Sequence, residues 1–283
     1  MRRLSVRRVI PVGLLLPVAI ASCGGGGNPL GQVVDAANAT RALSGTSYYL
    51  TLAGERLGTS SVRLPTGKAA YDFRAGVGYE ALTVQPHSGD TRTIYLDFLP
   101  AGVFVAPWPT PSGLLPPGKI WIAVPFAGAG APRPTDPLPA QLEGLSPELA
   151  LDEIAWGARS ASSLGTRTVN HVPMHEYLVS VDLAKARSAA QRAGRRGIAA
   201  AIASELRASP SGRAAIKVWV TGPGHIGKIE ATPAGTWLGR ATFQFTSFDA
   251  QFNRNPPRAS QSVPLAKIAD PSSRSLWTIA TAG

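Results

Sequence analysis

Short runs of alternating hydrophobic and polar residues predict two groups of β-strands in this sequence. The runs are rich in β-branched and aromatic residues, and Gly, Pro, Ser or Asp residues separate most of them. Short strands joined by such turns are typical of antiparallel sheets. The predicted strands are residues 47–52, 60–64, 68–74, 79–85, 91–98, 102–106 and 119–124 in the first group, and 163–170, 175–183, 214–221, 227–233 and 236–249 in the second.

Three segments carry apolar residues at helical spacing. Residues 30–43 predict a helix with one apolar face. Residues 137–158 contain a second helix, which starts with Ser146 as the cap and Pro147 at the first helical position. Residues 184–208 are rich in alanine and predict one long helix, whose small residues would allow it to lie close to a sheet.

The order of these elements predicts an α+β fold, because helices and strands do not alternate as βαβ units. We expect an antiparallel sheet with the helices on one side of it. Residues 107–118 are rich in proline and are predicted as a loop. The sequence has no long linker and no repeat of fixed period, so residues 30–283 are predicted to form a single domain.

The N-terminus has the layout of a secretory signal. Four arginines lie before an uncharged apolar stretch, residues 9–22, which ends in small side chains. This stretch is shorter than the roughly 20 apolar residues of a membrane-spanning helix, and Pro11 and Pro17 interrupt it. We therefore predict that residues 1–22 are a signal peptide and that the protein is exported.

Cys23 is the only cysteine, and the residues before it, Ile20, Ala21 and Ser22, resemble the bacterial lipobox. The resemblance implies that Cys23 receives a diacylglyceryl group and becomes the first residue of a lipoprotein anchored at the outer face of the cell membrane. Residues 23–29 are glycine-rich and are predicted as the lipidated cysteine and a flexible tether. An ordinary secreted protein with an incidental cysteine is the alternative; an intramolecular disulfide is excluded in either case.

The formal net charge of +11 includes the four arginines of the signal. Removing residues 1–22 leaves 24 of the 28 basic and all 17 acidic residues, a net charge of +7. Nucleic acid is not an expected partner of an exported protein whose basic residues are scattered. One local cluster, Arg192, Arg195 and Arg196, is interpreted as a solvated helix face, with contact to acidic lipid as the alternative.

Two motifs with possible chemistry are better explained as turns. GPGHIG, residues 222–227, matches GxGxxG, but the next residues predict a strand, whereas a nucleotide site requires a helix there. We interpret it as a hairpin turn. His171 and His175 have a spacing that suits a metal on a helix, but Pro173 lies between them, and they are interpreted as surface histidines.

No pattern predicts catalysis. The sequence has no GxSxG elbow and no SxxK motif. Asp152 and Glu153 are adjacent, so on a helix they point in different directions and cannot form a catalytic pair. We predict no catalytic residue, no metal and no cofactor. A polar cleft with clustered titratable groups would favour an enzyme again.

The second half of the chain resembles actinobacterial lipoproteins related to LppX and LprG, which share the LolA-like fold. The resemblance rests on the alternating strand YLVSVDL at 177–183, the strand VWV at 218–220 turning through a glycine-containing hairpin into KI at 228–229, and TFQFTSF at 242–248 before a proline-containing tail. GKIW at 118–121 is similar to a further strand of these proteins.

The resemblance implies a curved antiparallel half-barrel with helices packed on its concave side, around a hydrophobic cavity for acyl chains. Rows of large apolar residues along several predicted strands are compatible with such a cavity, although each row could also be packed core. The candidate ligand-binding residues are Tyr71, Phe73, Ile94, Leu96, Phe98, Val179, Val181, Val218, Val220, Phe243 and Phe245.

The function expected from these features is that of a membrane-anchored lipoprotein which binds a lipid or other amphiphile and carries it within the cell envelope. The alternative is a structural or partner-binding envelope lipoprotein without a ligand cavity. The expected partners are the amphiphile, the membrane at the N-terminal anchor and, in the alternative, an envelope protein.

Overall fold

The computed structural model describes residues 27–53, 63–85, 91–110, 113–126, 137–232, 239–250 and 255–268 of the 283-residue chain. The predicted signal peptide, Cys23 and the first glycines of the predicted tether lie outside the described residues. None of the helices among the described residues has both the length and the apolar character needed to cross a membrane.

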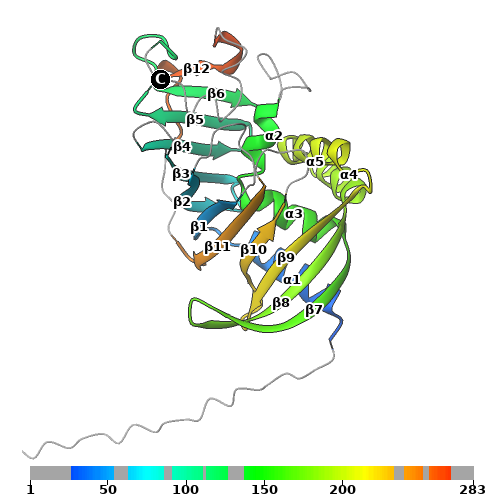
Figure 1. Ribbon diagram of the computed structural model, residues 1–283. Coiled ribbons are helices and arrows are strands. Elements are labelled where there is room, and N and C mark those ends of the chain that lie inside the picture. Colours follow the sequence, from blue (N-terminus) through cyan, green and yellow to red (C-terminus); the bar gives the residue numbers. More distant parts are fainter. Residues whose placement is uncertain are drawn as a thin grey trace, which may run out of the picture.

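One continuous sheet of twelve strands forms the body of the protein (Figure 1). Its first half is a meander in which every strand pairs antiparallel with the next. A short C-terminal strand pairs parallel with the last of these and forms one edge of the sheet. These strands are β1 (Thr46–Ala53), β2 (Arg63–Asp72), β3 (Val77–Gln85), β4 (Arg92–Leu99), β5 (Gly102–Trp108), β6 (Trp121–Pro125) and β12 (Ser262–Pro264).

The second half of the sheet is another antiparallel meander, which starts at the opposite edge and runs back towards the middle. Its last strand pairs antiparallel with β1, so the two halves meet at a seam in the middle of the sheet. The strands of this half are β7 (Ala158–Val169), β8 (Val172–Asp182), β9 (Arg213–Thr221), β10 (Ile226–Ala231) and β11 (Arg240–Ser247).

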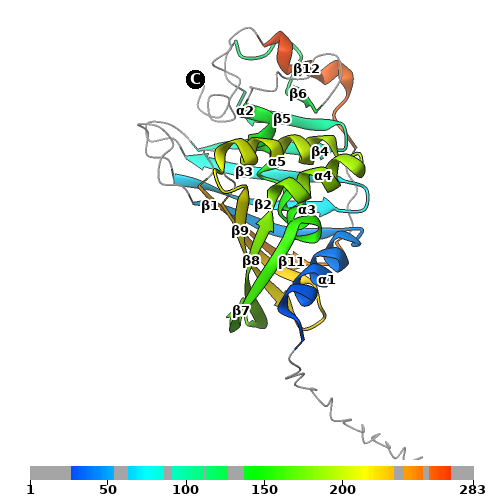
Figure 2. The same cartoon turned by 90° about the vertical axis from the view of Figure 1, so that its right-hand side faces the viewer.

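The five α-helices of the described residues lie on the inner side of the curved sheet (Figures 1 and 2). The helix α3 lies at the centre of this layer and contacts α1, α4, α5 and the strands β7, β8 and β10. Two 3₁₀ turns, η1 (Ala259–Gln261) and η2 (Leu265–Lys267), flank β12. The helices are α1 (Pro29–Arg41), α2 (Pro137–Glu143), α3 (Pro147–Gly157), α4 (Leu183–Arg192) and α5 (Arg196–Ala208).

The hydrophobic core lies between the sheet and the helices. Alternate residues of the strands, such as Leu50 on β1 and Leu96 on β4, are fully buried against the helix layer. Small residues of the helices, such as Ala186 and Ala190 on α4, are also fully buried and allow the layers to approach closely. The predicted α+β class, with a curved and largely antiparallel sheet and helices on its concave side, is therefore confirmed.

The predicted long helix over residues 184–208 is wrong, because the structure has two helices there. The helix α4 ends at Arg192, and Gly194 adopts a positive φ of 72°. The N–H of Gly194 donates to the carbonyl of Gln191, and the N–H of Arg195 donates to that of Ala190, which is the Schellman arrangement at a helix C-terminus. Because the flanking alanines have high helix propensity, the sequence pattern predicts a continuous helix and does not show that Gly194 ends α4.

Three predicted strand boundaries also differ from the structure. The strand β2 runs from Arg63 to Asp72, so it joins the described part of the predicted strand 60–64 to residues 68–72 of the predicted strand 68–74, whose last two residues lie in a turn. The strand β7 starts at Ala158, directly after α3, and β5 continues to Trp108, into the predicted loop. Strand propensity places a boundary from the local residues alone. In the folded protein, hydrogen bonds to a neighbouring strand can continue the strand beyond that boundary.

Both turn interpretations are confirmed. Residues 222–225 form the hairpin between β9 and β10, with Gly224 at a φ of 85°, and a strand follows instead of a helix. His171 lies at a positive φ of 64° in the turn between β7 and β8, and His175 lies on β8 within 3.3 Å of the Thr166 hydroxyl. Among the described residues no group of three or more potential ligands could hold a metal ion.

Candidate functional site

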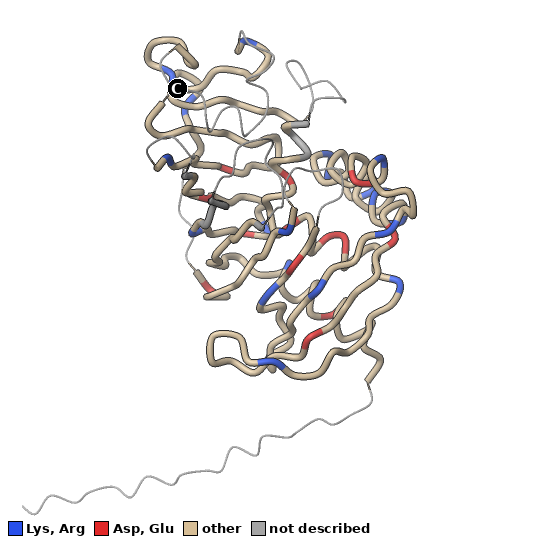
Figure 3. Tube along the Cα trace, viewed as in Figure 1, with Lys and Arg blue, Asp and Glu red and all other residues tan. Residues whose placement is uncertain are grey.

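Four buried acidic residues lie in the helix α3 or at the end of α2, just before it: Glu143, Glu148, Asp152 and Glu153. Figure 3 marks the acidic positions along the chain in red. The N-terminus of α3 is fixed by Ser146, whose hydroxyl accepts from the N–H of Glu148 at 3.2 Å, and by Pro147 at the first helical position. The first turn therefore presents Glu148 towards the strands β2 and β4. The last residue of α2, Glu143, lies close by, and both side chains are buried.

Glu148 is held by two partners from distant parts of the chain. The hydroxyl of Tyr71 on β2 donates to its Oε2 at 2.6 Å, and the Arg195 guanidinium forms an ion pair with its Oε1. Burial, and then the charge of Glu148, raise the pKa of Tyr71, so the hydroxyl remains a donor. Arg195 reaches this position because the chain breaks between α4 and α5.

Glu143 differs from Glu148 because its carboxyl group has no partner in the part of the chain that the structure describes. Only 5% of the residue is exposed, and its side chain forms no hydrogen bond or ion pair with any described residue. Burial and the nearby charge of Glu148 raise its pKa to about 8, against the opposing effect of Arg195. At pH 7 Glu143 is therefore mainly a neutral carboxylic acid, which can donate a hydrogen bond.

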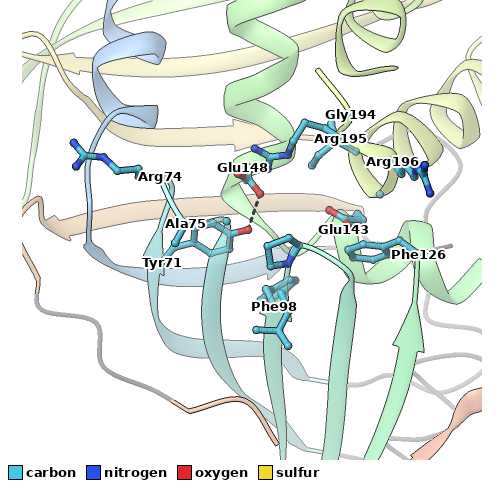
Figure 4. Close-up of a pocket in the computed structure, with 15 residues that line it drawn as sticks. Tyr71, Arg74, Ala75, Phe98, Phe126, Glu143, Glu148, Gly194, Arg195 and Arg196 are labelled. Carbon is cyan, nitrogen blue, oxygen red and sulfur yellow. Dashed lines mark hydrogen bonds and ion pairs between the residues drawn. The ribbon is translucent and has the colours of Figure 1, made fainter. Parts of the chain in front are cut away.

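A cavity of about 230 Å³ lies beside these two acids. It lies between the β2–β3 and β4–β5 turns on the sheet side and the junctions α2–α3 and α4–α5 on the helix side. The apolar part of its wall comes from Phe98, Phe126 and Ile198, and the exposed side chains of Arg74 and Arg196 lie on opposite sides of it (Figure 4). The cavity thus combines an apolar wall with a charged rim.

The eleven residues predicted to line a ligand cavity are all buried in one continuous core cluster. Tyr71 and Phe98 also line the 230 Å³ cavity. Phe243 faces a hollow of only about 10 Å³ beside Glu153 and Glu205. The other eight lie elsewhere in the core, and their contact with a ligand stays a prediction.

A second ion pair ties α1 to α3. The Nε atom of Arg41 lies 2.5 Å from Oδ1 of the fully buried Asp152, and its guanidinium stacks over the ring of Trp156 at 4.6 Å. Burial raises the pKa of Asp152 to about 7, although Arg41 opposes the shift. Glu153 instead faces Glu205, which confirms that the two adjacent acids of α3 point in different directions.

Sequence reasoning did not find Glu143, Glu148 and Arg195 as site residues. The interpretation of Arg195 as part of a solvated helix face is wrong, because its side chain turns inwards and forms an ion pair with Glu148. Arg192 and Arg196 are exposed, as that interpretation expected. The available signal was the density of acidic residues in the otherwise apolar segment 137–158, because buried acids require partners.

A second hollow, of about 270 Å³, lies on the face of β4, β5 and β6 that points away from the helices. Its wall is mainly aromatic and aliphatic and includes Tyr95, Trp108, Ile120 and Trp121. Trp108 is 63% exposed. Among the described residues that line this hollow, Tyr95 is the one titratable group.

No protein-family model and no curated protein matches the sequence. Among solved structures, the chain is similar to LprF from Mycobacterium bovis, with 10% identity over 81% of this chain and 96% of that one, at a TM-score of 0.43. It is similar to the lipoprotein LppX from Mycobacterium tuberculosis, with 10% identity over 79% and 96% of the two chains, at a TM-score of 0.44. A DUF1329 family protein from Desulfovibrio piger matches with 10% identity over 80% and 95%, at a TM-score of 0.31.

Proposed function

We propose that the protein is an exported lipoprotein that binds a lipid or other amphiphile and carries it within the cell envelope. The observation that carries this proposal is the 230 Å³ cavity, with its apolar wall and charged rim. An amphiphile has the same two parts, because its acyl chain gains from leaving water while its headgroup needs polar partners. Transport of this kind requires binding and release, and no covalent chemistry.

The size of the cavity indicates which part of the amphiphile it takes. Pockets for small molecules usually measure about 300–1,000 Å³, so 230 Å³ suits a headgroup and the start of an acyl chain. In this proposal the rest of the chain enters between the sheet and the helices, against the eleven predicted residues. Each methylene buried there contributes about 0.8 kcal/mol. Entry requires α4 and α5 to move away from the sheet, and the break at Gly194 lies at the cavity.

The proposed anchor would keep the domain close to the membrane. The helix α1 starts at Pro29, six residues after Cys23. Six extended residues span at most roughly 20 Å, so the folded body could not move far from a lipidated Cys23. Such a carrier would collect its ligand from the membrane in which it is anchored.

The anchor is tested by Cys23→Ser in a bacterial host that processes lipoproteins. We expect the variant to appear in the soluble exported fraction or to remain as uncleaved precursor, because serine offers no thiol for the diacylglyceryl group. Membrane fractionation followed by mass spectrometry of the N-terminus measures both outcomes. If the variant is processed and membrane-bound like the natural chain, the proposed anchor is wrong.

An enzyme would need reactive groups in the cavity. Its described lining includes no Ser, Thr, Cys, His or Lys, so two carboxyl groups and a tyrosine hydroxyl remain as candidates. Glu148 and Tyr71 are bound to each other, and Glu148 is also paired with Arg195. This arrangement fixes the wall of a binding site and supports a carrier better than an enzyme.

The carrier is tested by purifying residues 24–283 and identifying extracted lipid by mass spectrometry. Ala75 is exposed at the cavity, so we expect Ala75→Trp to fill the entrance and to reduce the co-purified lipid at least about fivefold without unfolding the protein. Ala184→Trp is the matched control, because Ala184 is exposed on α4 away from the cavity. A lipid-free natural chain that also shows no thermal shift with added lipids would support the alternative, a partner-binding lipoprotein.

A further inference from the structure

The unpartnered carboxyl group of Glu143 indicates what the cavity binds. The other carboxyl groups that line the core beside it have partners: Glu148 has Tyr71 and Arg195, and Asp152 has Arg41. Glu143 is as buried as these, and its side chain faces the cavity without any partner among the described residues (Figure 4). The Glu143 oxygens are not among the fully enclosed side-chain atoms that lack a partner, so they are accessible from the cavity, where a group of the ligand can bind them.

The charges around Glu143 indicate whether the ligand group that binds there is an anion or a cation. Glu148 is balanced by Arg195, and Asp152 by Arg41. Arg196 forms no ion pair with any described residue and lies on the same side of the cavity as Glu143 (Figure 4). The titratable and charged groups that face Glu143 are Glu148 and Asp152 from α3, Tyr71 and Arg74 from the end of β2 and its turn, and Arg195 and Arg196 from the α4–α5 junction.

We propose, on the basis of the amphiphile-binding function, that the cavity binds the phosphodiester of an anionic amphiphile. In this site Arg196 supplies the unbalanced positive charge, and the carboxyl group of Glu143 donates a hydrogen bond to a phosphate oxygen. A guanidinium and a neutral acid both act as donors, which matches an anion that only accepts. An ammonium headgroup would face three guanidinium groups and is disfavoured.

The protonation of Glu143 makes this site sensitive to pH. Burial raises its pKa to about 8, so the donor is present at pH 6.5 and is largely lost at pH 9. An ionised Glu143 would repel the phosphate as well as lose the hydrogen bond. If only the protonated form binds, the apparent affinity falls about tenfold between these two pH values.

The test is isothermal titration of residues 24–283 with ligands that share a lauroyl chain and differ in charge. Lauroyl lysophosphatidylglycerol carries one phosphodiester charge at both pH values, lauroyl lysophosphatidylcholine is zwitterionic, and lauroylglycerol is neutral. We expect lysophosphatidylglycerol to bind at least about tenfold more tightly than the other two at pH 6.5, and to weaken about tenfold at pH 9. Dimethyl phosphate tests the free anion and is expected to bind far more weakly.

Three variants separate the site from general electrostatics. Glu143→Gln keeps an N–H donor that does not titrate, so its affinity at pH 6.5 should change by less than about threefold while its pH dependence disappears. Arg196→Gln should lose about tenfold in affinity for lysophosphatidylglycerol and none for lauroylglycerol. Arg192→Gln is the matched control, because Arg192 is equally exposed but does not line the cavity.

The outcomes distinguish the proposed anionic headgroup from the proposed carrier function. Equal binding of the three lauroyl ligands would overturn the anionic headgroup and leave the carrier function intact. No binding of any of them would overturn the carrier function itself. Dimethyl phosphate binding as tightly as lysophosphatidylglycerol would assign the site to a free phosphodiester, and an unchanged pH dependence in Glu143→Gln would exclude Glu143 as the donor.

Discussion

Tyr71 has two roles, one for its ring and one for its hydroxyl, and the local sequence predicts only the first. Its ring packs with Phe73 and Phe98 in the core, as the alternation of β2 predicts, with ring centroids 5.0 and 6.0 Å away. Its hydroxyl reaches Glu148, 77 residues further along the chain. The pattern of the strand could predict the buried ring, because alternation is local. It could not predict the hydroxyl contact, which depends on how α3 crosses β2.

The contact of Tyr71 with Glu148 can be measured by Tyr71→Phe. We expect the free energy of unfolding to fall by about 1.5–3 kcal/mol, because a hydrogen bond to a charged group is lost and one oxygen of a buried carboxylate is left without a partner. Urea unfolding at pH 7 measures the change. Tyr49→Phe is the control, since Tyr49 is 45% exposed, and should change stability by less than about 0.5 kcal/mol. Equal stability of both variants would contradict the role of the hydroxyl.

At the scale of elements, the sequence predicted the strands better than the helices. Burial alternates clearly in strands such as β6 and β11, and the predicted strands overlap the observed ones except for β12, which the sequence does not predict. The single predicted helix over residues 184–208 failed because helix propensity is summed over a window and does not detect one left-handed residue. That one residue, Gly194, turns Arg195 towards Glu148 and thereby forms part of the site.

The break between α4 and α5 can be tested by Gly194→Ala. Gly194 has a φ of 72°, which costs an L-residue with a Cβ about 1–2 kcal/mol, so we expect a loss of stability of this size in thermal or urea unfolding. No atom lies within 4 Å of an added Cβ, so the loss would come from the backbone alone. Gly222→Ala is the control, since its Cβ would also meet nothing and its φ is not positive. If both variants are equally stable, the strained turn is not required.

On the scale of the whole molecule, burial of acids connects the fold to pH. Glu80 lies in the core of the first half of the sheet, where one oxygen accepts from the Tyr48 hydroxyl at 2.5 Å. Burial raises its pKa from 4.5 to about 8, although the Tyr48 hydroxyl opposes the shift. Burial shifts the pKa of Glu143 and Asp152 in the same direction. The amino-acid composition cannot predict these raised pKa values, because it gives the number of acidic residues and not which of them are buried.

These shifts predict that the protein is more stable at mildly acidic pH. An acid with a higher pKa in the folded state binds more protons when folded, so its stabilisation is complete below pH 4.5 and is lost as the pH rises to about 8. We expect the free energy of unfolding to fall between pH 5 and 8. In Glu80→Gln this fall should be smaller by at least about 1–2 kcal/mol, since one pKa unit corresponds to about 1.4 kcal/mol. Urea unfolding across this range measures it.

The exposed Asp35 on α1 provides the control for this experiment. Asp35→Asn makes the same acid-to-amide change at the surface, away from the buried acids, and so controls for the substitution itself. A natural chain whose stability rises from pH 5 to 8, or a Glu80→Gln variant with the same slope as the natural chain, would contradict the role of buried neutral acids in this fold.

The seam between β1 and β11 determines when the fold can be completed. The strand β1 ends at Ala53 and its partner β11 starts at Arg240, so nearly the whole chain is synthesised before they can pair. Until then, β1 presents one unpaired edge and the apolar residues Tyr48, Leu50 and Leu52 to the surroundings. In the exported lipoprotein proposed above, the first half would therefore wait on the far side of the membrane for the last strand. The time between export and closure of the sheet is when this chain is most exposed to aggregation and proteolysis.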